Sequence, residues 1–417
     1  MKDILRPLDA IHPNRSGDID MEIKKIAIIG AGAMGHGIAQ LAAMTGLEVT
    51  MRDISEEFLE NGMKNIRWSI GKFVEKGKIS PSEAEKTLKR IRPMVLLKDS
   101  VSESDFVIEA VPEKLELKKQ VFSEMTSYAP SHAILATNTS ALPVTEIAAA
   151  TKRPEKVIGM HFFNPPALMR LVEVVMGKST EQNTVDATIE LTKKLGKEPV
   201  LCKKDVPGFI ANRITISGTN LVAWMVGKGE YTVEEVDAAA MYKAGMPMGT
   251  FALLDFTGLD IAYHVMMFME EREPNFEVAP LIKEKMKKGE IGVKAGKGFY
   301  TYPDKGKWAM PQIPEEKAER FDPMTQTYAM VNVAAELIRN DVATAEDIDK
   351  TLKLGFNMPI GVLELADTLG VDTMVEKLKT FEAKYGAYYR PSPLLLEMVK
   401  KGKLGTKTGI GFYSYKK

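Results

Sequence analysis

A short glycine-rich turn near the N-terminus limits the folds open to this chain more than any other feature. The turn, residues 30–35, has glycine at its first, third and last positions, follows the apolar segment 24–29 and precedes an apolar helical pattern. Such glycines permit a tight turn from a strand into a helix. Apolar strands then alternate with helical patterns, for example at 113–128, as far as about residue 200. This alternation predicts a doubly wound, mostly parallel sheet.

The same turn is a candidate binding site for a dinucleotide. Its glycines let the backbone approach a pyrophosphate closely, and the amide groups that open the following helix favour negative charge. Asp53, at the end of the next predicted strand, would bind the adenosine ribose hydroxyls and repel a 2′-phosphate, which favours NAD over NADP. The neighbouring Arg52 weakens this preference. A glycine-rich turn without a ligand is the alternative interpretation.

Length and composition exclude several classes of function. The chain has 417 residues, enough for two or three domains, and its 56 Lys+Arg balance its 56 Asp+Glu. Zero net charge argues against a nucleic-acid binder. The single Cys202 excludes an intrachain disulfide and fits a cytoplasmic location, and the five histidines form no ligand pair, so no metal is expected. Residues 26–47 are uncharged but contain five glycines, so we interpret them as strand, turn and helix rather than a membrane span.

The C-terminal half contains an internal duplication. Val236-Asp237 matches Ile348-Asp349 at an offset of 112 residues, and several further pairs keep that offset. Gly298-Phe299-Tyr300 matches Gly411-Phe412-Tyr413 at 113, so one residue has been inserted late in the second copy. A constant offset predicts two copies of one helical domain. The expected segments are an N-terminal tail (1–22), a sheet domain (23–204), a first helical copy (205–302), a linker (303–321) and a second helical copy (322–417).

A run in the middle of the chain, 161–174, places a histidine and a glutamate on two predicted strands. His161 follows the apolar segment 157–160, Glu173 lies within the apolar segment 171–175, and a Pro-Pro turn separates them. Burying a carboxylate in such a strand is costly without a partner, and the imidazole on the neighbouring strand is the available one. A histidine held by a carboxylate is the arrangement that a general base needs. A core pair without chemistry is the alternative.

Three other polar motifs lie where a ligand could bind. Residues 136–140 (Ala-Thr-Asn-Thr-Ser) follow a predicted strand at the edge of the sheet where ligands bind, although helix capping also explains them. The helical stretch 64–78 carries five cations and one acid, which could pair with phosphates but more commonly forms a solvated face. Residues 205–213 open the helical region and place Asn212 early on a helix that faces the sheet, within reach of a substrate carbonyl.

Taken together, these motifs resemble the 3-hydroxyacyl-CoA dehydrogenase family over about residues 23–417. The resemblance rests on the glycine-rich turn and on 138–140, 161–173 and 207–213. It implies an α/β Rossmann-type domain followed by two tandem all-α domains like those of 6-phosphogluconate dehydrogenase. It also implies NAD-dependent oxidation of (S)-3-hydroxyacyl-CoA to 3-ketoacyl-CoA and the reverse reduction, on short chains such as 3-hydroxybutyryl-CoA.

The resemblance gives roles to individual residues. His161 matches the family's catalytic base and Glu173 its orienting carboxylate, while Ser140 and Asn212 match residues that contact the substrate oxygens. The implied cofactor-binding residues are Gly30, Gly32, Ala33, Met34, Gly35, Asp53, Ala110, Val111, Glu113, Lys118, Asn138, Ser140 and Asn164. The implied coenzyme A and substrate contacts are Ser69, Lys76, Ser140, Asn164 and Lys294.

The second helical copy departs from the single-domain form of the family. Met324 is the counterpart of Asn212 at the offset of 112, so this copy lacks the catalytic asparagine and is expected to be structural. It could supply within one chain the contact that pairs short family members as dimers. A monomer with an internal pseudo-dimer and a homodimer both stay open, as does fusion to or association with an enoyl-CoA hydratase.

Two other functions remain as alternatives. The first is a dehydrogenase of free 3-hydroxy acids, which would have no use for Lys76 as a coenzyme A contact. The second is a non-catalytic, NAD-binding structural protein, against which the intact set of predicted catalytic residues argues.

Overall fold

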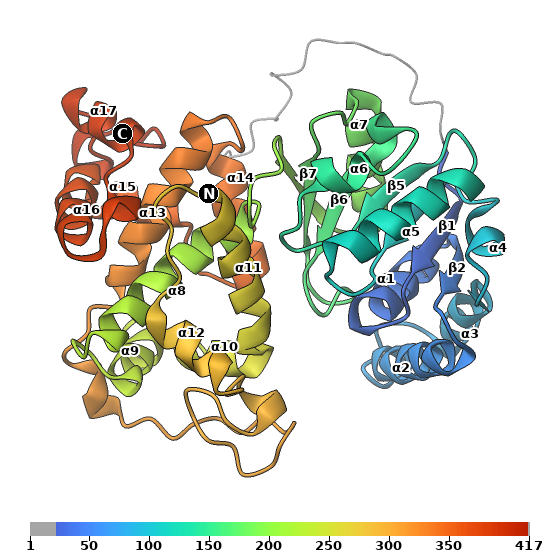
Figure 1. Ribbon diagram of the computed structural model, residues 1–417, viewed down its shortest axis with the longest axis horizontal. Coiled ribbons are helices and arrows are strands. Elements are labelled where there is room, and N and C mark those ends of the chain that lie inside the picture. Colours follow the sequence, from blue (N-terminus) through green and yellow to red (C-terminus); the bar gives the residue numbers. More distant parts are fainter. Residues whose placement is uncertain (1–21, 416–417) are drawn as a thin grey trace, which may run out of the picture.

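The computed structural model describes residues 22–415, which form a sheet domain and a helical body (Figure 1). The sheet has eight strands in the order β3-β2-β1-β4-β5-β6-β7-β8. Their bounds are β1 (Lys25–Ile29), β2 (Glu48–Arg52), β3 (Ile91–Met94), β4 (Phe106–Glu109), β5 (Ile134–Thr137), β6 (Val157–Phe162), β7 (Leu171–Met176) and β8 (Glu198–Cys202). All neighbours pair in parallel except β6 and β7, which are antiparallel. The predicted doubly wound, mostly parallel sheet is confirmed.

Helices cover both faces of the sheet, so the central strands are buried on both sides. In β1, Ala27 and Ile29 enter one apolar core while Ile26 and Ile28 enter the other, as the two-residue period of a strand requires. The first of these cores continues into the helical body, so one apolar core joins the sheet domain to the helical body. The helices and short turns of this domain are α1 (Ala33–Met44), α2 (Glu56–Glu75), α3 (Pro81–Lys89), α4 (Leu97–Val101), α5 (Leu115–Tyr128), α6 (Val144–Ala148), η1 (Pro154–Lys156) and α7 (Gln182–Lys194).

The helical body consists of two similar copies joined by a linker. The first copy comprises α8 (Ala211–Gly227), α9 (Val233–Ala238), η2 (Ala239–Lys243), α10 (Thr250–Thr257), α11 (Leu259–Arg272), α12 (Pro280–Lys287) and η3 (Val293–Ala295). The second comprises α13 (Met324–Arg339), α14 (Ala345–Phe356), α15 (Val362–Leu369), α16 (Val371–Tyr385), η5 (Ala387–Tyr389), α17 (Pro393–Lys400) and η6 (Thr406–Thr408). The linker contains one short turn, η4 (Glu315–Ala318). Helices α8 and α13 pack directly against each other.

Buried polar contacts repeat between the copies. Asp237 accepts hydrogen bonds from two backbone N–H groups at the start of α10 and from the Tyr300 hydroxyl. Asp349 accepts the same three bonds from the start of α15 and from Tyr413. The carboxylates are 112 residues apart and the tyrosines 113, as the sequence offsets predict.

The inserted residue can be placed from the helix lengths. Helix α11 has 14 residues and its counterpart α16 has 15. Before this point Asn220 matches Asn332 at 112, whereas their side-chain amides donate to the carbonyl oxygens of Glu277 and Arg390, which are 113 apart. The extra residue therefore lies within α16.

Two helix boundaries differ from the prediction. Helix α5 begins at Leu115 rather than at 113, because the Glu113 side chain accepts hydrogen bonds from the loop after β5 instead of lying in the first turn of the helix. Helix α2 ends at Glu75, so Lys76 is its C-cap and Lys78 follows it. Within residues 22–415 no single helix is long and apolar enough to cross a membrane; only α10 and α11 together, bent by 102°, meet that test of length and composition.

Candidate active site

The glycine-rich turn connects β1 to α1 in a shape that requires glycine. Gly30 has a φ of +110°, and a Cβ atom there would lie 2.5 Å from the carbonyl oxygen of Ala110. At Gly32, by contrast, no described atom lies within 4 Å of where a Cβ would stand, and no side chain caps the start of α1. Uncapped amide groups that face open space at a helix N-terminus suit an anion. The turn therefore fits the pyrophosphate of NAD.

Asp53 is held beside this turn at the end of β2. One carboxylate oxygen accepts the N–H of Ala31 at 2.7 Å, and the other accepts the N–H of Ile54 at 2.7 Å. This fixes the carboxylate where a ribose would follow the pyrophosphate. The Nε atom of Arg52 donates to the carbonyl oxygen of Val95 at 3.0 Å, so part of its guanidinium is already engaged by the protein.

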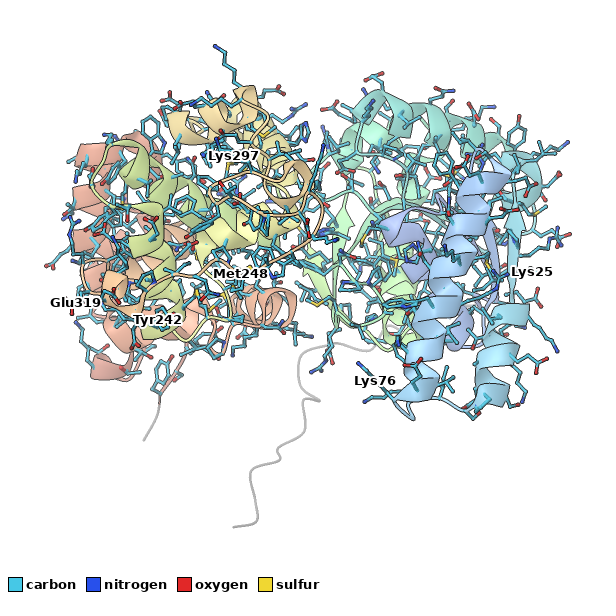
Figure 2. All side chains as sticks on the ribbon, turned by 90° about the horizontal axis from the view of Figure 1, so that it is seen from below. Lys25, Lys76, Tyr242, Met248, Lys297 and Glu319 are labelled. Atoms are coloured by element: carbon cyan, nitrogen blue, oxygen red, sulfur yellow. The ribbon has the colours of Figure 1, made fainter. Side chains whose placement is uncertain are left out.

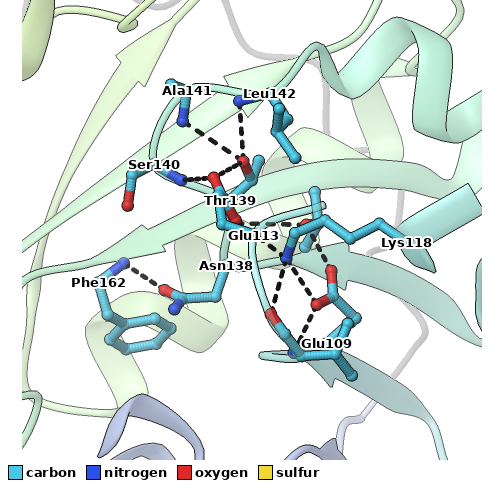
Figure 3. Close-up of polar contacts among 11 residues, drawn as sticks. Glu109, Glu113, Lys118, Asn138, Thr139, Ser140, Ala141, Leu142 and Phe162 are labelled. Atoms are coloured by element: carbon cyan, nitrogen blue, oxygen red, sulfur yellow. Dashed lines mark hydrogen bonds and ion pairs between the residues drawn. The ribbon is translucent and has the colours of Figure 1, made fainter. Parts of the chain in front are cut away.

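A polar network, buried at Glu109 and Lys118, lies at the carboxyl ends of β4 and β5 (Figure 3). The Lys118 ammonium lies 2.7 Å from Glu109 and 3.2 Å from Glu113. Burial by itself would lower the pKa of Lys118, but the two carboxylates outweigh it and raise the pKa, so the side chain stays a cation. Glu113 in turn accepts hydrogen bonds from the Thr139 hydroxyl and from the N–H of Ser140. The network therefore fixes the loop that carries Ser140.

The sequence prediction missed Glu109, which is fully buried on β4. Its second carboxylate oxygen accepts the hydroxyl of Thr137 at 2.7 Å, which ties β4 to β5. Asn138 links the end of β5 to β6, because its side-chain oxygen accepts the N–H of Phe162 at 2.9 Å. The signal was present in the sequence as an acidic residue in an apolar strand, at the end of the strand for Glu109 and inside it for Glu173.

His161 and Glu173 lie directly opposite each other in the antiparallel pair of β6 and β7. The Nδ1 atom of His161 is 2.6 Å from Oε2 of Glu173, and both side chains are buried. Oε1 of Glu173 accepts the N–H groups of Ile210 and Ala211, at 3.1 and 2.8 Å, where α8 begins. Because a carboxylate only accepts hydrogen bonds, Nδ1 carries a proton and Nε2 is left free to take one.

Ser140 and Asn212 are brought to the same place. The side-chain amide of Asn212, one residue beyond Ala211 on α8, donates to the carbonyl oxygen of Ser140 at 3.1 Å. A continuous set of contacts thus links His161, Glu173, the start of α8 and the loop after β5. Two aromatic rings that the sequence did not single out flank the imidazole: the ring centroid of Phe163 lies 4.7 Å from it and that of Phe209 lies 6.1 Å from it.

Among the described residues, the predicted coenzyme A contacts other than Ser140 form no hydrogen bond or ion pair with this group. Ser69 is half-buried on α2, and the exposed Lys76 projects from the end of that helix (Figure 2). Asn164 is exposed in the turn after β6. Lys294 pairs with Asp260 at 3.0 Å.

Lys294 has a counterpart in the second copy. Lys407 pairs there with Asp372 as Lys294 does with Asp260. A pair found in both copies stabilises each helical domain, so the coenzyme A contact at Lys294 stays a prediction. In the part of the chain that the structure describes, no cluster of His, Cys, Asp and Glu side chains is arranged to hold a metal ion.

Protein-family models match nearly the whole chain. The NAD-binding domain of 3-hydroxyacyl-CoA dehydrogenase matches residues 25–206, and the C-terminal domain of the same family matches 208–302 and again 326–415. The chain belongs to the 3-hydroxyacyl-CoA dehydrogenase family. Its cofactor is therefore NAD, and its activity is that of the family, the NAD-dependent oxidation of 3-hydroxyacyl-CoA. The second C-terminal match coincides with the predicted second helical copy.

Individual relatives agree with the family assignment. A probable 3-hydroxybutyryl-CoA dehydrogenase of Bacillus subtilis is 39% identical over 287 residues, which cover 68% of this chain and 99% of the relative. The fatty acid oxidation complex subunit alpha of Pseudomonas paraeruginosa is 34% identical over 407 residues, 92% of this chain and 56% of the relative. The crystal structure of 3-hydroxybutyryl-CoA dehydrogenase from Escherichia coli K12 superposes with a TM-score of 0.82 at 28% identity, covering 92% of this chain and 100% of that one.

Replacing Asp53 should change the choice between the two nicotinamide cofactors. We expect Asp53→Ser to weaken NADH binding about tenfold, because a charged hydrogen-bond acceptor is lost, and to strengthen NADPH binding because a repulsive charge is removed. Fluorescence titration with both cofactors measures this. Asp99→Ser, an exposed position on α4, is the control. An unchanged ratio of the two affinities in Asp53→Ser would rule out the ribose contact.

Proposed function

We propose that this enzyme interconverts short-chain (S)-3-hydroxyacyl-CoA and 3-ketoacyl-CoA with His161 as its general acid and base. The observation that supports this most directly is the buried hydrogen bond from His161 to Glu173, 2.6 Å long, beside Ser140 and Asn212. The preference for short chains is supported by the names of relatives, which include 3-hydroxybutyryl-CoA dehydrogenases.

In the oxidative direction, Nε2 of His161 takes the proton of the substrate's 3-hydroxyl group. Glu173 stabilises the imidazolium that forms, and its own position is fixed by the two N–H groups at the start of α8. NAD⁺, when bound at the glycine-rich turn, supplies the acceptor for the hydride that leaves C3. In the reverse direction the imidazolium of His161 returns the proton to the substrate oxygen, so one nitrogen serves as both acid and base.

Ser140 and Asn212 orient the substrate in this proposal. The N–H of Ser140 is held by Glu113, and its carbonyl oxygen is held by Asn212, so the hydroxyl side chain projects from a fixed loop. The Asn212 amide keeps a second N–H and an oxygen for the thioester. Holding the 3-hydroxyl within reach of Nε2 replaces a bimolecular encounter with a positioned proton transfer.

We further propose the domain bounds predicted from the sequence, 23–204, 205–302 and 322–417, and that the second helical copy makes one chain equivalent to a dimer of short relatives. The direct packing of α13 on α8 supports the internal pairing of the two copies.

Association with other β-oxidation enzymes is supported by the match to fatty acid oxidation complex subunits. A cytoplasmic location is proposed because the lone Cys202 is buried and unpaired.

Oxidation of NADH by acetoacetyl-CoA tests the proposed substrate. We expect rapid turnover with the thioester and NADH. With free acetoacetate or with NADPH we expect turnover at least about a hundredfold slower, because binding interactions that contribute to the rate are lost. Turnover with the free acid alone would instead indicate a dehydrogenase of free 3-hydroxy acids. Tight NADH binding without turnover on either substrate would indicate a non-catalytic NAD-binding protein.

A further inference from the structure

Aromatic rings from the sheet domain and from the second helical copy meet beside His161. The ring of Phe163 packs against the imidazole, with centroids 4.7 Å apart and planes tilted by 44°. Phe356, the last residue of α14, meets the ring of Phe163 edge to face, with centroids 6.0 Å apart and an angle of 83°. Such edge-to-face pairs are a favoured geometry for aromatic rings. A side chain of the second copy thus lies one ring away from His161.

The neighbouring Gly355 brings α14 close to the same ring. It is buried, and a Cβ there would lie 3.1 Å from Cε1 of Phe163 and 3.0 Å from Cδ2 of Leu171. Its backbone is not in the left-handed region, so close approach rather than backbone conformation favours glycine here. Helix α14 therefore packs directly on Phe163 and on β7, the strand that carries Glu173.

Two polar contacts hold α14 and the loop before it against the sheet. The N–H of Lys203 donates to the carbonyl oxygen of Val342 at 2.8 Å. The Lys350 ammonium, on α14, lies 3.2 Å from Glu198 at the start of β8. These contacts join α14 and the loop before it to the β8 side of the sheet.

The first helical copy does not make the equivalent contact. At the offset of 112, Ala244 is the counterpart of Phe356 and Lys243 is the counterpart of Gly355. There η4 of the linker packs against α9 and η2, and Lys243 donates to the carbonyl oxygen of Glu319. Figure 2 shows Glu319 on the side of the helical body away from the sheet domain. The same position thus faces the linker in one copy and the catalytic strand in the other, and its residues differ accordingly.

We propose that the second helical copy holds the imidazole of His161 in its reactive orientation, because Phe356 supports Phe163 and Phe163 supports the imidazole face. Phe356 is thus a positioning residue for the reaction. The bond to Glu173 holds one nitrogen of the imidazole, and the adjacent ring of Phe163 limits tilting of the imidazole about its Cβ–Cγ bond. This inference rests on the proposed role of His161 as the general acid and base.

Phe356→Ala tests the inference. We expect kcat with acetoacetyl-CoA and NADH to fall about tenfold, while KM and NADH affinity change less than about twofold, because the proposed role of the ring is to support His161 through Phe163 rather than to bind a ligand. The rate of NADH oxidation in a single turnover, normalised to the NADH sites present, should fall equally. This normalised rate is insensitive to a loss of folded protein. Phe356→Leu restores apolar bulk and should return the rate to within about threefold of the wild type.

Two variants serve as comparisons. Phe381→Ala removes a buried ring of α16 whose centroid lies 6.2 Å from that of Tyr328, within the second copy. This variant should lower the Tm without changing the normalised rate. Gly355→Ala adds a methyl group 3.1 Å from the ring of Phe163 and should lower the normalised rate by less than Phe356→Ala does. A normalised rate for Phe356→Ala within about twofold of the wild type, or an equal fall in Phe381→Ala, would overturn the inference. His161→Gln, measured in parallel, separates the two proposals: if it keeps turnover, the proposed role of His161 fails instead.

Discussion

His161→Gln should lower kcat for the reduction of acetoacetyl-CoA about a thousandfold, within the range that general acid–base groups contribute. The glutamine amide can still donate a hydrogen bond to Glu173, so the buried carboxylate keeps a partner. It cannot supply the proton that the keto oxygen of acetoacetyl-CoA must gain as hydride is added at C3. Steady-state oxidation of NADH at saturating concentrations of both substrates measures this change.

NADH binding provides the internal control for this variant. His161 lies on β6, whereas the glycine-rich turn and Asp53 lie at the ends of β1 and β2, so NADH affinity should stay within about twofold. His132→Gln is the matched variant, since His132 is exposed and pairs with Asp105 at 3.3 Å outside the site, and it should keep full activity. A His161→Gln enzyme with more than a tenth of the wild-type kcat would contradict the proposed role.

The strands and the duplication could be predicted because their signals are local or periodic. Strands such as β4 and β5 are buried on both faces and therefore appear in the sequence as continuous apolar runs between turns. The order of the eight strands could not be obtained in this way, because it depends on which distant segments pair. The hydrogen bond between His161 and Glu173 was anticipated, since a buried carboxylate and an imidazole on adjacent segments have few other partners.

The contacts that support the site were harder to predict than the site itself. The sequence pattern does not distinguish Phe163, Phe209 and Phe356 from ordinary core residues. An apolar pattern predicts that an aromatic side chain is buried but not which side chain its ring contacts. Lys118 was expected only as a cofactor contact, whereas the structure also pairs it with the buried Glu109. Partners that are far apart in sequence become visible only once the chain is folded.

The resemblance to short family members gave no indication of the role proposed for the second copy, the support of His161 through Phe356. Met324 in place of a catalytic asparagine predicted a purely structural domain. The packing of α14 on β7 agrees with a structural domain but also places that domain against the strand that carries Glu173. A duplicated domain that loses its own catalytic residue can still act on the site of the first copy by contact.

Lys118→Met should destabilise the folded enzyme by about 3–5 kcal/mol, the usual cost of leaving a buried charge without its partner. The Lys118 side chain is 1% exposed and that of Glu109 is fully buried, so water cannot replace the lost cation. The carboxylate of Glu109 would keep only the N–H of Val111 and the Thr137 hydroxyl as donors, each at 2.7 Å. Urea-induced unfolding followed by circular dichroism measures the change.

The pH of this measurement follows from the pKa of Lys118. The carboxylates raise that pKa above its ordinary value of 10.5, despite the opposite effect of burial. A cation with a raised pKa stabilises the fold fully below the pKa of the unfolded chain, and this stabilisation is lost as the pH rises through the folded value. Unfolding near pH 7 therefore reports the full contribution of the lysine. Lys114→Met, at an exposed position, is the control and should change stability by less than about 0.5 kcal/mol.

Adding Glu109→Gln to Lys118→Met separates stability from catalysis. Glutamine removes the unpaired charge, and its single amide oxygen can still accept the N–H of Val111. The amide NH2 then faces Thr137, whose hydroxyl can turn to accept from it, so the double variant should regain more than about half of the lost stability. A loss below about 1 kcal/mol in Lys118→Met, or no recovery in the double variant, would contradict a buried pair of this kind. Turnover should recover less than stability does, because Glu113, which holds the N–H of Ser140, still lacks its cation.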